Sequence, residues 1–282
     1  MSIETINPAT GERLKTYDTM GSKQALDIVD SCHNDYNQWR EVNFDARAKL
    51  MRTAANSLLA QKNAFAELIA LEMGKPITQG IAEIEKCALV CNFYADNAET
   101  FLSPRHINSE HHKSFVCYRP LGIVFAIMPW NYPFWQVFRF ACPTLMAGNG
   151  AILKHAPIST GAALAIENVF RSAGFPKHLF RTLIIKDSDA ESVIASPKIT
   201  AVTLTGSERA GSIVGSIAAR HLKKVVLELG GSDPYVICED ADLELAASEI
   251  VASRMNNTGQ VCIAAKRVIA CQSIIEELKE KV

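Results

Sequence analysis

The sequence has 282 residues, of which 48% are hydrophobic and 21% are charged, and its formal net charge is −1. This composition is typical of a globular protein with one large or two smaller domains, and the near-zero charge argues against nucleic acid or an anionic membrane as a partner. The start lacks the pattern of a secretory signal, no apolar run reaches the roughly 18 residues of a membrane span, and the eight cysteines show no framework spacing, so we expect a soluble, cytoplasmic protein with reduced thiols.

The first hundred residues are predicted to be mostly helical. Apolar side chains recur at helical spacing over residues 22–39, with Ser22 as the N-cap, and again over residues 45–73 and 81–101. A Gly-Lys-Pro sequence follows residue 73 and should end the second of these helices.

Cys87 and Cys91 lie four residues apart and should share one helix face. Two thiols could begin a metal site, so a thiol–metal binder is one alternative for the chain. No further cysteine or histidine pair follows at ligand spacing. We therefore expect core packing at these positions and no metal.

Residues 104–120 break the helical pattern and predict an extended arm or hairpin. His106, His111 and His112 lie in this segment. Histidine ligands of a metal normally have supporting carboxylates or thiols, so a solvated loop is favoured over a zinc site.

From Gly122 the pattern changes to short apolar runs that alternate with helix-like segments. The expected strands are 122–127, 151–154, 182–185, 201–204 and 224–229, and the expected helices are 134–146, 160–173, 188–195 and 209–219. Such alternation predicts an α/β fold with a parallel sheet covered on both faces. Ligands of such sheets bind at the carboxyl ends of the strands, so functional residues are sought after each run.

Two candidates follow the first two strands. Asn131, within the run PWNYP, presents an amide from a turn restrained by two prolines, which suits an oxyanion donor. The alternative is an aromatic turn that covers the sheet edge. Lys154 ends the second strand, where it could bind ribose hydroxyls or a phosphate, although a solvated lysine is as common there.

Three further candidates come later in the chain. Gly206 and Ser207 open a helix whose free N–H groups suit a pyrophosphate, although this is not the GxGxxG pattern and a plain helix cap is the alternative. Glu228 is an acid on an apolar strand, and it is either a general base or a cap for backbone donors. Cys262 follows a Gly-Gln turn between helix-like residues 241–255 and strand-like residues 266–271, so it is either a nucleophile or a small buried hydrophobic residue.

In this order, the segments together resemble the aldehyde dehydrogenase superfamily, and above all its succinate-semialdehyde dehydrogenase branch. The matching motifs are INPATGE at Ile6, EMGKP at Glu72, RPLG at Arg119, PWNYP at Pro129, TGS at Thr205, ELGG at Glu228 and NTGQVC at Asn257. The resemblance implies a Rossmann-like NAD(P)-binding domain over residues 1–229 with a helical N-terminal part. Its residues 104–120 would be an arm of the oligomerisation type, and residues 230–282 would be the start of a catalytic domain.

The resemblance also implies the chemistry, which is oxidation of an aldehyde to a carboxylate with NAD or NADP. Cys262 would attack the aldehyde carbon, and the oxyanion would be stabilised by the Asn131 amide and the Cys262 N–H. Oxidation leaves a thioester on the cysteine, and Glu228 would activate the water that releases the acid.

Cofactor contacts are implied in the same way. Ser207, with Gly206, is similar to the family's pyrophosphate contact, and Lys154 is similar to its adenosine-ribose contact. Trp130 and Leu229 would line the cofactor. NAD-specific members usually carry a glutamate three residues after the lysine, where this chain has Pro157, so both NAD and NADP are considered.

The substrate is expected to be a small aldehyde. Arg139 lies eight residues after Asn131, where succinate-semialdehyde dehydrogenases carry an arginine that pairs with the distal carboxylate. A surface arginine is the alternative. A second arginine of those enzymes is replaced here by Asn256, so the contacts with a dicarboxylate-like substrate are expected to be fewer.

Family members continue far beyond the catalytic cysteine, whereas this sequence stops at Val282. We therefore expect a chain truncated within its catalytic domain, whose full-length relatives form homo-oligomers. The alternative to an active enzyme is an inactive remnant that binds dinucleotide or associates with intact subunits.

Overall fold

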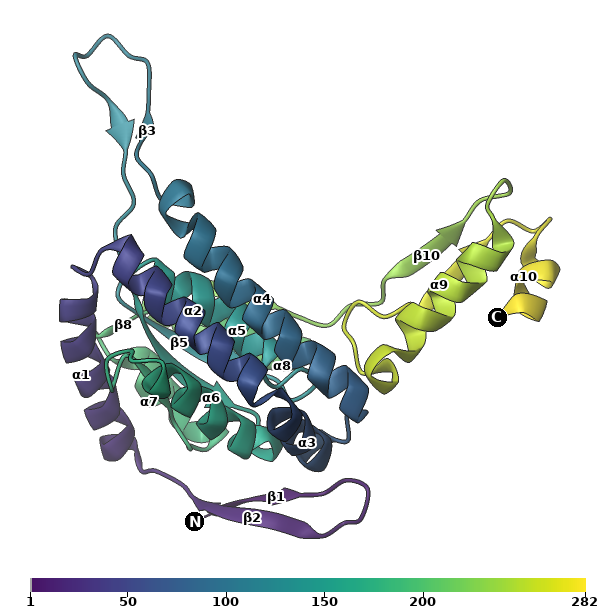
Figure 1. The fold of residues 1–282 in the computed structure, drawn as a ribbon, viewed down its shortest axis with the longest axis horizontal. Coiled ribbons are helices and arrows are strands. Elements are labelled where there is room, and N and C mark those ends of the chain that lie inside the picture. Colours follow the sequence, from purple (N-terminus) through teal and green to yellow (C-terminus); the bar gives the residue numbers. More distant parts are fainter. Residues whose placement is uncertain (1) are drawn as a thin grey trace. The chain divides into compact units, whose positions relative to one another are not determined.

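The computed structural model describes residues 2–282 (Figure 1). The chain divides into two compact units, an N-terminal unit that ends at Glu228 and a C-terminal unit of Leu229–Val282. The cofactor and catalytic roles assigned to the two parts stay predictions. In the described part of the chain, no helix is long and apolar enough to cross a membrane.

The N-terminal unit begins with a β-hairpin that the predicted helical pattern did not include. Strands β1 (Ser2–Ile6) and β2 (Arg13–Asp18) pair antiparallel. In the turn between them, the Asn7 side chain accepts a hydrogen bond from the backbone N–H of Ala9 at 2.9 Å, and Gly11 has a φ of 75°. This local turn, rather than apolar periodicity, marks the hairpin.

Four helices follow, and two predictions about them are wrong. The helices are α1 (Ser22–Trp39), α2 (Phe44–Ala60), α3 (Lys62–Met73) and α4 (Ile77–Phe101). The predicted single helix over residues 45–73 is two helices, because Gln61 leaves the helical conformation at φ −112° and ψ 13°. Ser22 is the first helical residue instead of the N-cap, which is Gly21.

The centre of the unit is a five-stranded parallel sheet, as predicted. Its strands are β5 (Ile123–Met128), β6 (Gly150–His155), β7 (Phe180–Thr182), β8 (Ile199–Thr205) and β9 (Lys224–Glu228). Their spatial order is β7-β6-β5-β8-β9. This order reverses direction between β5 and β8, and ligands of such sheets bind outside the carboxyl ends of the strands at that point.

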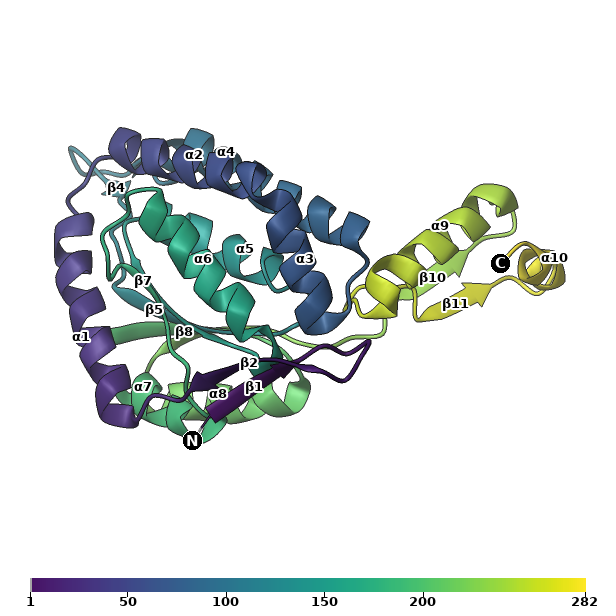
Figure 2. The ribbon, with the colours of Figure 1, turned by 60° about the horizontal axis from the view of Figure 1, so that its bottom comes forward.

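Helices cover both faces of the sheet (Figure 2). Helices α5 (Trp135–Met146) and α6 (Thr160–Ser172) lie on one face, together with α2, α3 and α4. Helices α7 (Ala190–Ala195) and α8 (Glu208–Arg220) lie on the opposite face. The short turns η1 (Pro157–Ser159) and η2 (Asp187–Asp189) precede α6 and α7.

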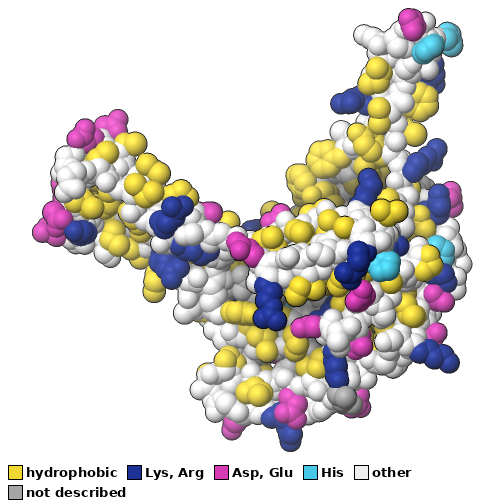
Figure 3. All heavy atoms as spheres, turned by 180° about the vertical axis from the view of Figure 1, so that it is seen from behind, with side chains coloured by type: hydrophobic (Ala, Val, Ile, Leu, Met, Phe, Trp, Pro, Cys, Tyr) yellow, Lys and Arg dark blue, Asp and Glu magenta, His cyan; other side chains and the backbone are white. Residues whose placement is uncertain are grey.

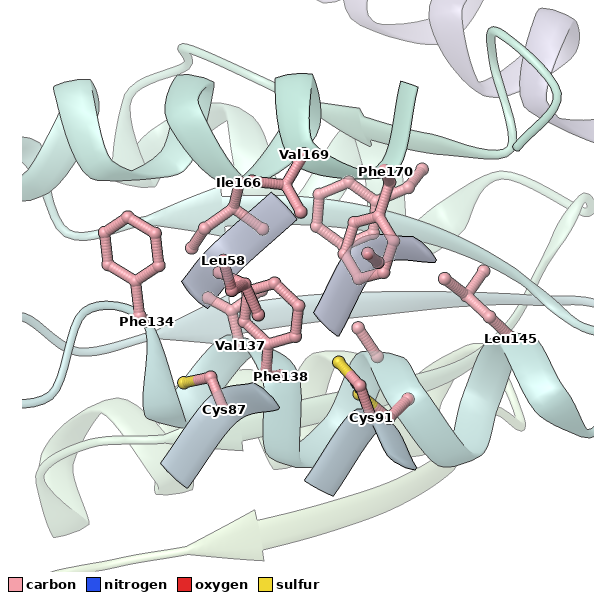
Figure 4. Packing of buried hydrophobic residues seen from close by; sticks show 14 of the residues in the cluster. Leu58, Cys87, Cys91, Phe134, Val137, Phe138, Leu145, Ile166, Val169 and Phe170 are labelled. Atoms are coloured by element: carbon pink, nitrogen blue, oxygen red, sulfur yellow. The ribbon is translucent and has the colours of Figure 1, made fainter. Parts of the chain in front are cut away.

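The main core lies between the sheet and the helices of the α5 face (Figure 4). Phe138 of α5 stacks on Phe170 of α6 at 5.1 Å between ring centroids. Cys87 and Cys91 are fully buried in this core, as predicted for packing residues. The Sγ atom of Cys91 lies 3.5 Å from that of Cys142, and burial raises the pKa of the Cys142 thiol, so Cys142 is a protonated packing group.

Residues 104–120 form the expected hairpin, which projects from the unit (Figure 1). Its strands β3 (Arg105–His106) and β4 (Phe115–Val116) pair antiparallel over two residues each. Hydrophobic side chains are exposed along it and histidines gather at its tip (Figure 3). An exposed apolar hairpin suits an association surface, and its role in oligomerisation stays a prediction.

The last strand of the sheet, β9, has exposed side chains at all five positions. Val226 is 60% exposed, although the strand is parallel and apolar. Parallel strands are ordinarily covered on both faces. The strand that ends in Glu228 is therefore the least protected strand of the sheet.

The C-terminal unit has a separate small core. Strands β10 (Pro234–Ile237) and β11 (Arg267–Ala270) pair in parallel, and they accompany helices α9 (Leu243–Met255) and α10 (Ile275–Lys281). The buried apolar residues of this core are Ile237, Ala247, Ile250, Ala265 and Leu278. So few buried residues contribute little stabilisation by apolar burial.

One buried carboxylate connects two helices of the N-terminal unit. Glu72 of α3 accepts hydrogen bonds from the backbone N–H groups of Gly161 at 2.7 Å and Ala162 at 3.0 Å, at the start of α6. The residue is 2% exposed. Burial raises the pKa of Glu72 from 4.5 to about 7, and the two backbone hydrogen bonds oppose this shift.

The raised pKa predicts a pH-dependent stability. The folded chain keeps a proton on Glu72 between pH 4.5 and about 7, where the unfolded chain has lost it. The contribution of Glu72 to the free energy of unfolding is therefore fully present below pH 4.5 and is lost as the pH rises through about 7. Through Glu72, the free energy of unfolding of wild type should fall by at most about 3 kcal/mol between pH 5 and pH 7.5. Glu72→Gln cannot ionise, so we expect urea unfolding of this variant to lack that fall.

The slopes of wild type and variant are compared, because other groups titrate in the same window. Burial lowers the pKa of His155 to about 4, and its effect has the opposite sign, since that stability is lost as the pH falls. His155 is present in both proteins and cancels in the difference. Identical slopes in wild type and Glu72→Gln would show that Glu72 does not titrate in this range.

Candidate functional site

The loop that carries Asn131 connects the end of β5 to α5. The backbone N–H groups of Phe134 and Trp135 donate to Oε1 of Glu83 at 2.8 and 2.9 Å. These donors lie at the start of α5, where N–H groups have no partner within the helix. Glu83 belongs to α4, so a side chain from a different helix fixes the end of the Asn131 loop.

A buried ion pair supports this contact. Lys75 forms a salt bridge with Glu83, and both side chains are fully buried. The Lys75 ammonium also lies over the Tyr132 ring, 3.6 Å from its centroid. Burial raises the pKa of Glu83 and lowers the pKa of Lys75, and each charge opposes the shift of the other. Lys75 therefore contacts both the loop and the carboxylate that caps α5.

His155 fixes the loop from the neighbouring strand. Its Nδ1 accepts from the backbone N–H of Ala156 at 2.8 Å, so Nε2 is the protonated nitrogen, and it donates to the carbonyl oxygen of Pro133 at 2.9 Å. The residue is buried, and burial lowers its pKa to about 4. It is therefore neutral at pH 7 and joins the ends of β5 and β6.

Lys154 is the penultimate residue of β6, which runs one residue beyond its predicted end. The partner of Lys154 comes from the next strand connection. The Lys154 Nζ donates to Oδ1 of Asp187 at 2.6 Å. The Lys154 side chain is 5% exposed, whereas the Asp187 side chain is 91% exposed. The structure thus places a carboxylate beside the predicted ribose contact.

Gly206 and Ser207 lie between β8 and α8. Ser207 is the N-cap of α8, and its Oγ accepts from the backbone N–H of Ala210 at 3.2 Å. The N–H of Gly206 donates to the carbonyl oxygen of Glu228 at 3.0 Å. The cap alternative is therefore correct for the Ser207 side chain, and the first turn of α8 still offers backbone donors to an anion.

Glu228 and Arg139 are close neighbours in the structure. An Arg139 guanidinium nitrogen lies 4.0 Å from a carboxylate oxygen of Glu228, and another donates to Oγ1 of Thr205 at 3.3 Å. The Glu228 side chain is 55% exposed, so it is open to solvent although its strand is apolar. The two polar groups are accessible to a bound molecule.

Cys262 lies in the C-terminal unit, in a turn before β11, and it is exposed. Its carbonyl oxygen accepts from Nζ of Lys266 at 2.7 Å. Three residues upstream have left-handed backbone conformations, with φ of 49° at Asn257, 57° at Thr258 and 78° at Gly259. Such conformations are costly for non-glycine residues, above all for β-branched threonine, and they occur preferentially at functional sites.

The two predicted lining residues belong to different units. Trp130 follows β5 in the N-terminal unit and is 38% exposed. Leu229 is the first residue of the C-terminal unit and is half-buried. Their role in lining the cofactor stays a prediction.

The residues of the N-terminal unit fit a dinucleotide. The strand order β7-β6-β5-β8-β9 is that of a Rossmann-like fold. The buried cation Lys154 lies next to the last residue of β6, and the start of the thirteen-residue helix α8 presents backbone donors after β8. Cations and helix N-termini are the groups that bind phosphates and ribose hydroxyls at this edge. The strand order and these residues are typical of the class of dinucleotide-binding folds.

Comparison with known proteins identifies the family. The aldehyde dehydrogenase family matches residues 1–282, and the chain belongs to this family. A probable succinate-semialdehyde dehydrogenase (NADP(+)) of Synechocystis sp. is 48% identical, and the match covers 100% of this chain and 62% of that protein. The succinate semialdehyde dehydrogenase (NAD(P)+) Sad of Escherichia coli is 44% identical over 98% of this chain and 60% of its own length.

Solved structures agree with the sequence relatives. The succinic semialdehyde dehydrogenase of Streptococcus pyogenes, crystallised with NADP+, has a TM-score of 0.96 and 33% identity, with 99% of this chain and 62% of that chain covered. The predicted family and fold class are therefore confirmed. The chain spans about 62% of the length of the relatives it matches, as expected if family members continue beyond the cysteine.

Sequence reasoning did not find three residues beside the predicted site. Asp187 lies two residues after the end of the predicted strand 182–185, so the rule that ligands bind at strand ends could have indicated it. Glu83 precedes Cys87 and Cys91 at helical spacing, so it was an acid on a buried face. His155 follows Lys154 in the sequence, but only the structure shows its bond to Pro133.

The Lys75–Glu83 pair predicts a large and specific loss of stability. Lys75→Met leaves the Glu83 carboxylate buried without its counter-charge, which costs about 3–5 kcal/mol. We expect this loss in urea unfolding of Lys75→Met. The double variant Lys75→Met/Glu83→Gln should lose less stability than the sum of the losses of the two single variants.

A matched control pair joins α3 to α4. Lys62 pairs with Glu85 at 2.5 Å, but these side chains are 38% and 47% exposed. An exposed pair contributes at most about 1 kcal/mol, so Lys62→Met should be nearly neutral. If Lys75→Met were as mild as Lys62→Met, the buried pair would not determine the position of the loop.

Proposed function

We propose that this chain contributes the cofactor domain and the nucleophile of an NAD(P)-dependent aldehyde dehydrogenase, with succinate semialdehyde or a similar short carboxylated aldehyde as substrate. The observation that supports this most directly is the set of strand-end residues. Asn131 and Ser207 follow β5 and β8, and Lys154 and Glu228 lie within the last two residues of β6 and β9, so all four belong to the carboxyl ends of the parallel strands. The family match over the whole chain adds Cys262.

In this proposal Cys262 is the nucleophile. Its thiolate attacks the aldehyde carbon, and the new C–S bond places a negative charge on the former carbonyl oxygen. The Asn131 amide and the Cys262 backbone N–H stabilise that oxyanion. The contacts of Glu83 and His155 restrain the loop that carries the amide, which keeps its donor positioned before the substrate binds.

Bound NAD or NADP supplies the two-electron oxidant that converts the cysteine adduct into a thioester. Glu228 then removes a proton from the water that attacks the thioester, and the carboxylic acid product leaves Cys262. Lys154 binds the ribose hydroxyls, and the start of α8 at Ser207 binds the pyrophosphate. Gly206, Trp130 and Leu229 line the cofactor.

Arg139 determines the preference for a carboxylated aldehyde in this proposal. Its guanidinium is accessible and lies beside Thr205 and Glu228 at the carboxyl ends of β8 and β9. Guanidinium groups bind carboxylates through paired N–H donors. A substrate with a distal carboxylate would bind this group, whereas an aldehyde without one would not.

The nucleophile is tested by trapping the acyl group on the cysteine. We expect the 282-residue chain, incubated with succinate semialdehyde and either nicotinamide cofactor, to reduce the cofactor. Cys262→Ala should abolish this reduction. Glu228→Gln should form the thioester but release it slowly, because no general base activates water, so intact mass spectrometry should show one acyl group retained on the protein.

The exposed cysteines Cys238 and Cys271 provide matched controls. Their alanine variants should keep wild-type reduction, and combined with Glu228→Gln they should still retain the acyl group. A folded wild-type chain that binds the cofactor but neither turns over nor becomes acylated would favour the alternative, an inactive remnant that binds dinucleotide or associates with intact subunits.

The substrate assignment makes a separate prediction. Arg139→Met removes the partner of the distal carboxylate, so KM for succinate semialdehyde should rise about 10- to 100-fold, which corresponds to about 1.4–2.8 kcal/mol. KM for an unsubstituted aldehyde of the same length should change little. A similar rise for both aldehydes, measured by steady-state kinetics, would show that Arg139 has another role.

A further inference from the structure

The Lys154–Asp187 pair combines a buried cation with an exposed anion. Lys154 is fixed at the end of β6 with 5% of its side chain exposed, and Asp187, in η2 after β7, is 91% exposed. Their charged atoms lie 2.6 Å apart. Any group that binds the Lys154 ammonium therefore also meets the Asp187 carboxylate.

The charges around this pair cancel. Lys186 and Asp189 flank Asp187, and the backbone N–H of Lys186 donates to Oδ2 of Asp189 at 3.3 Å. His155, next to Lys154, is buried, and its pKa is lowered to about 4, so it adds no positive charge at pH 7. Two lysines and two aspartates thus leave no net positive charge for an incoming dianion.

A carboxylate beside the adenosine ribose repels a phosphate on the 2′ position of that ribose. Carboxylates of dinucleotide-binding folds accept hydrogen bonds from the 2′-hydroxyl of NAD, whereas 2′-phosphate binding requires a cation. The 2′-phosphate carries a charge of about −1.5 to −2 at neutral pH. Next to a carboxylate it is repelled, and the pairing of Lys154 with Asp187 reduces the attraction that would compensate.

We propose that Asp187 is a selectivity residue of the dinucleotide site, whose carboxylate beside Lys154 disfavours a 2′-phosphate, so that this chain binds NAD in preference to NADP. The inference rests on the proposed function, because it assumes that Lys154 contacts the adenosine ribose. This preference for NAD differs from the name of the Synechocystis relative, which gives NADP(+) as the cofactor. Asp187 also supplies, from a different loop, the carboxylate that Pro157 lacks.

A purely structural role for Asp187 has a different consequence. If Asp187 only kept Lys154 in place, its removal would weaken NAD and NADP alike, because the ribose contact is common to both. Selectivity predicts that removal of Asp187 strengthens NADP binding and leaves NAD binding nearly unchanged. The ratio of the two dissociation constants therefore distinguishes the roles without any measurement of turnover.

The experiment is titration of the 282-residue chain with NAD and with NADP by calorimetry, without aldehyde. We expect wild type to bind NAD more tightly. In Asp187→Asn, the dissociation constant of NADP should fall about tenfold, which is about 1.4 kcal/mol, while that of NAD changes less than about twofold. Asp187→Ala should shift NADP in the same direction, which separates the loss of charge from the gain of an amide.

Asp189→Asn is the matched control, because it removes the same charge from the same turn but does not contact Lys154. It should shift the ratio by less than about threefold, since screening by water and salt weakens the more distant charge. A parallel loss of both affinities, or no change in the ratio, would overturn the selectivity proposal alone. Absence of binding of either dinucleotide to folded wild type would overturn the proposed function with it.

Discussion

The arrangement of the site depends on the buried contact between Glu83 and the start of α5. One carboxylate from α4 accepts two backbone N–H groups at the end of the Asn131 loop, and Lys75 compensates its charge. A buried carboxylate is stable only with such partners. Glu83 and Lys75 of the helical N-terminal part therefore fix the Asn131 loop, which is far from them in the sequence.

Much of the fold was predictable because its signals are local. Short apolar runs separated by helical periods require a parallel sheet, and the predicted strands coincide with β5, β6, β8 and β9 within two residues. Candidate residues such as Lys154 were predictable for the same reason, since they follow the strands in sequence. The family motifs then assigned them roles that composition and periodicity alone left open.

Other features depend on contacts between distant segments. The break at Gln61 contains no glycine or proline, and the β1–β2 hairpin is marked only by an Asx turn at Asn7. Asp187 and Lys154 are 33 residues apart, and they meet because β6 and β7 are adjacent in the sheet. Periodicity describes one element at a time, so it cannot show which polar groups meet across elements.

The exposed position of β9 has a consequence for motion. Strand β5 pairs with neighbours on both sides, and four of its six residues are buried, whereas β9 pairs only with β8 and all five of its residues are exposed. Local opening is easiest where few buried contacts must be lost. Amide exchange should therefore be slowest in β5 and fastest in β9. The carboxylate of Glu228 then lies on the most mobile strand, whereas Lys154 lies on the buried strand β6 and Asn131 lies in a loop fixed by Glu83 and His155.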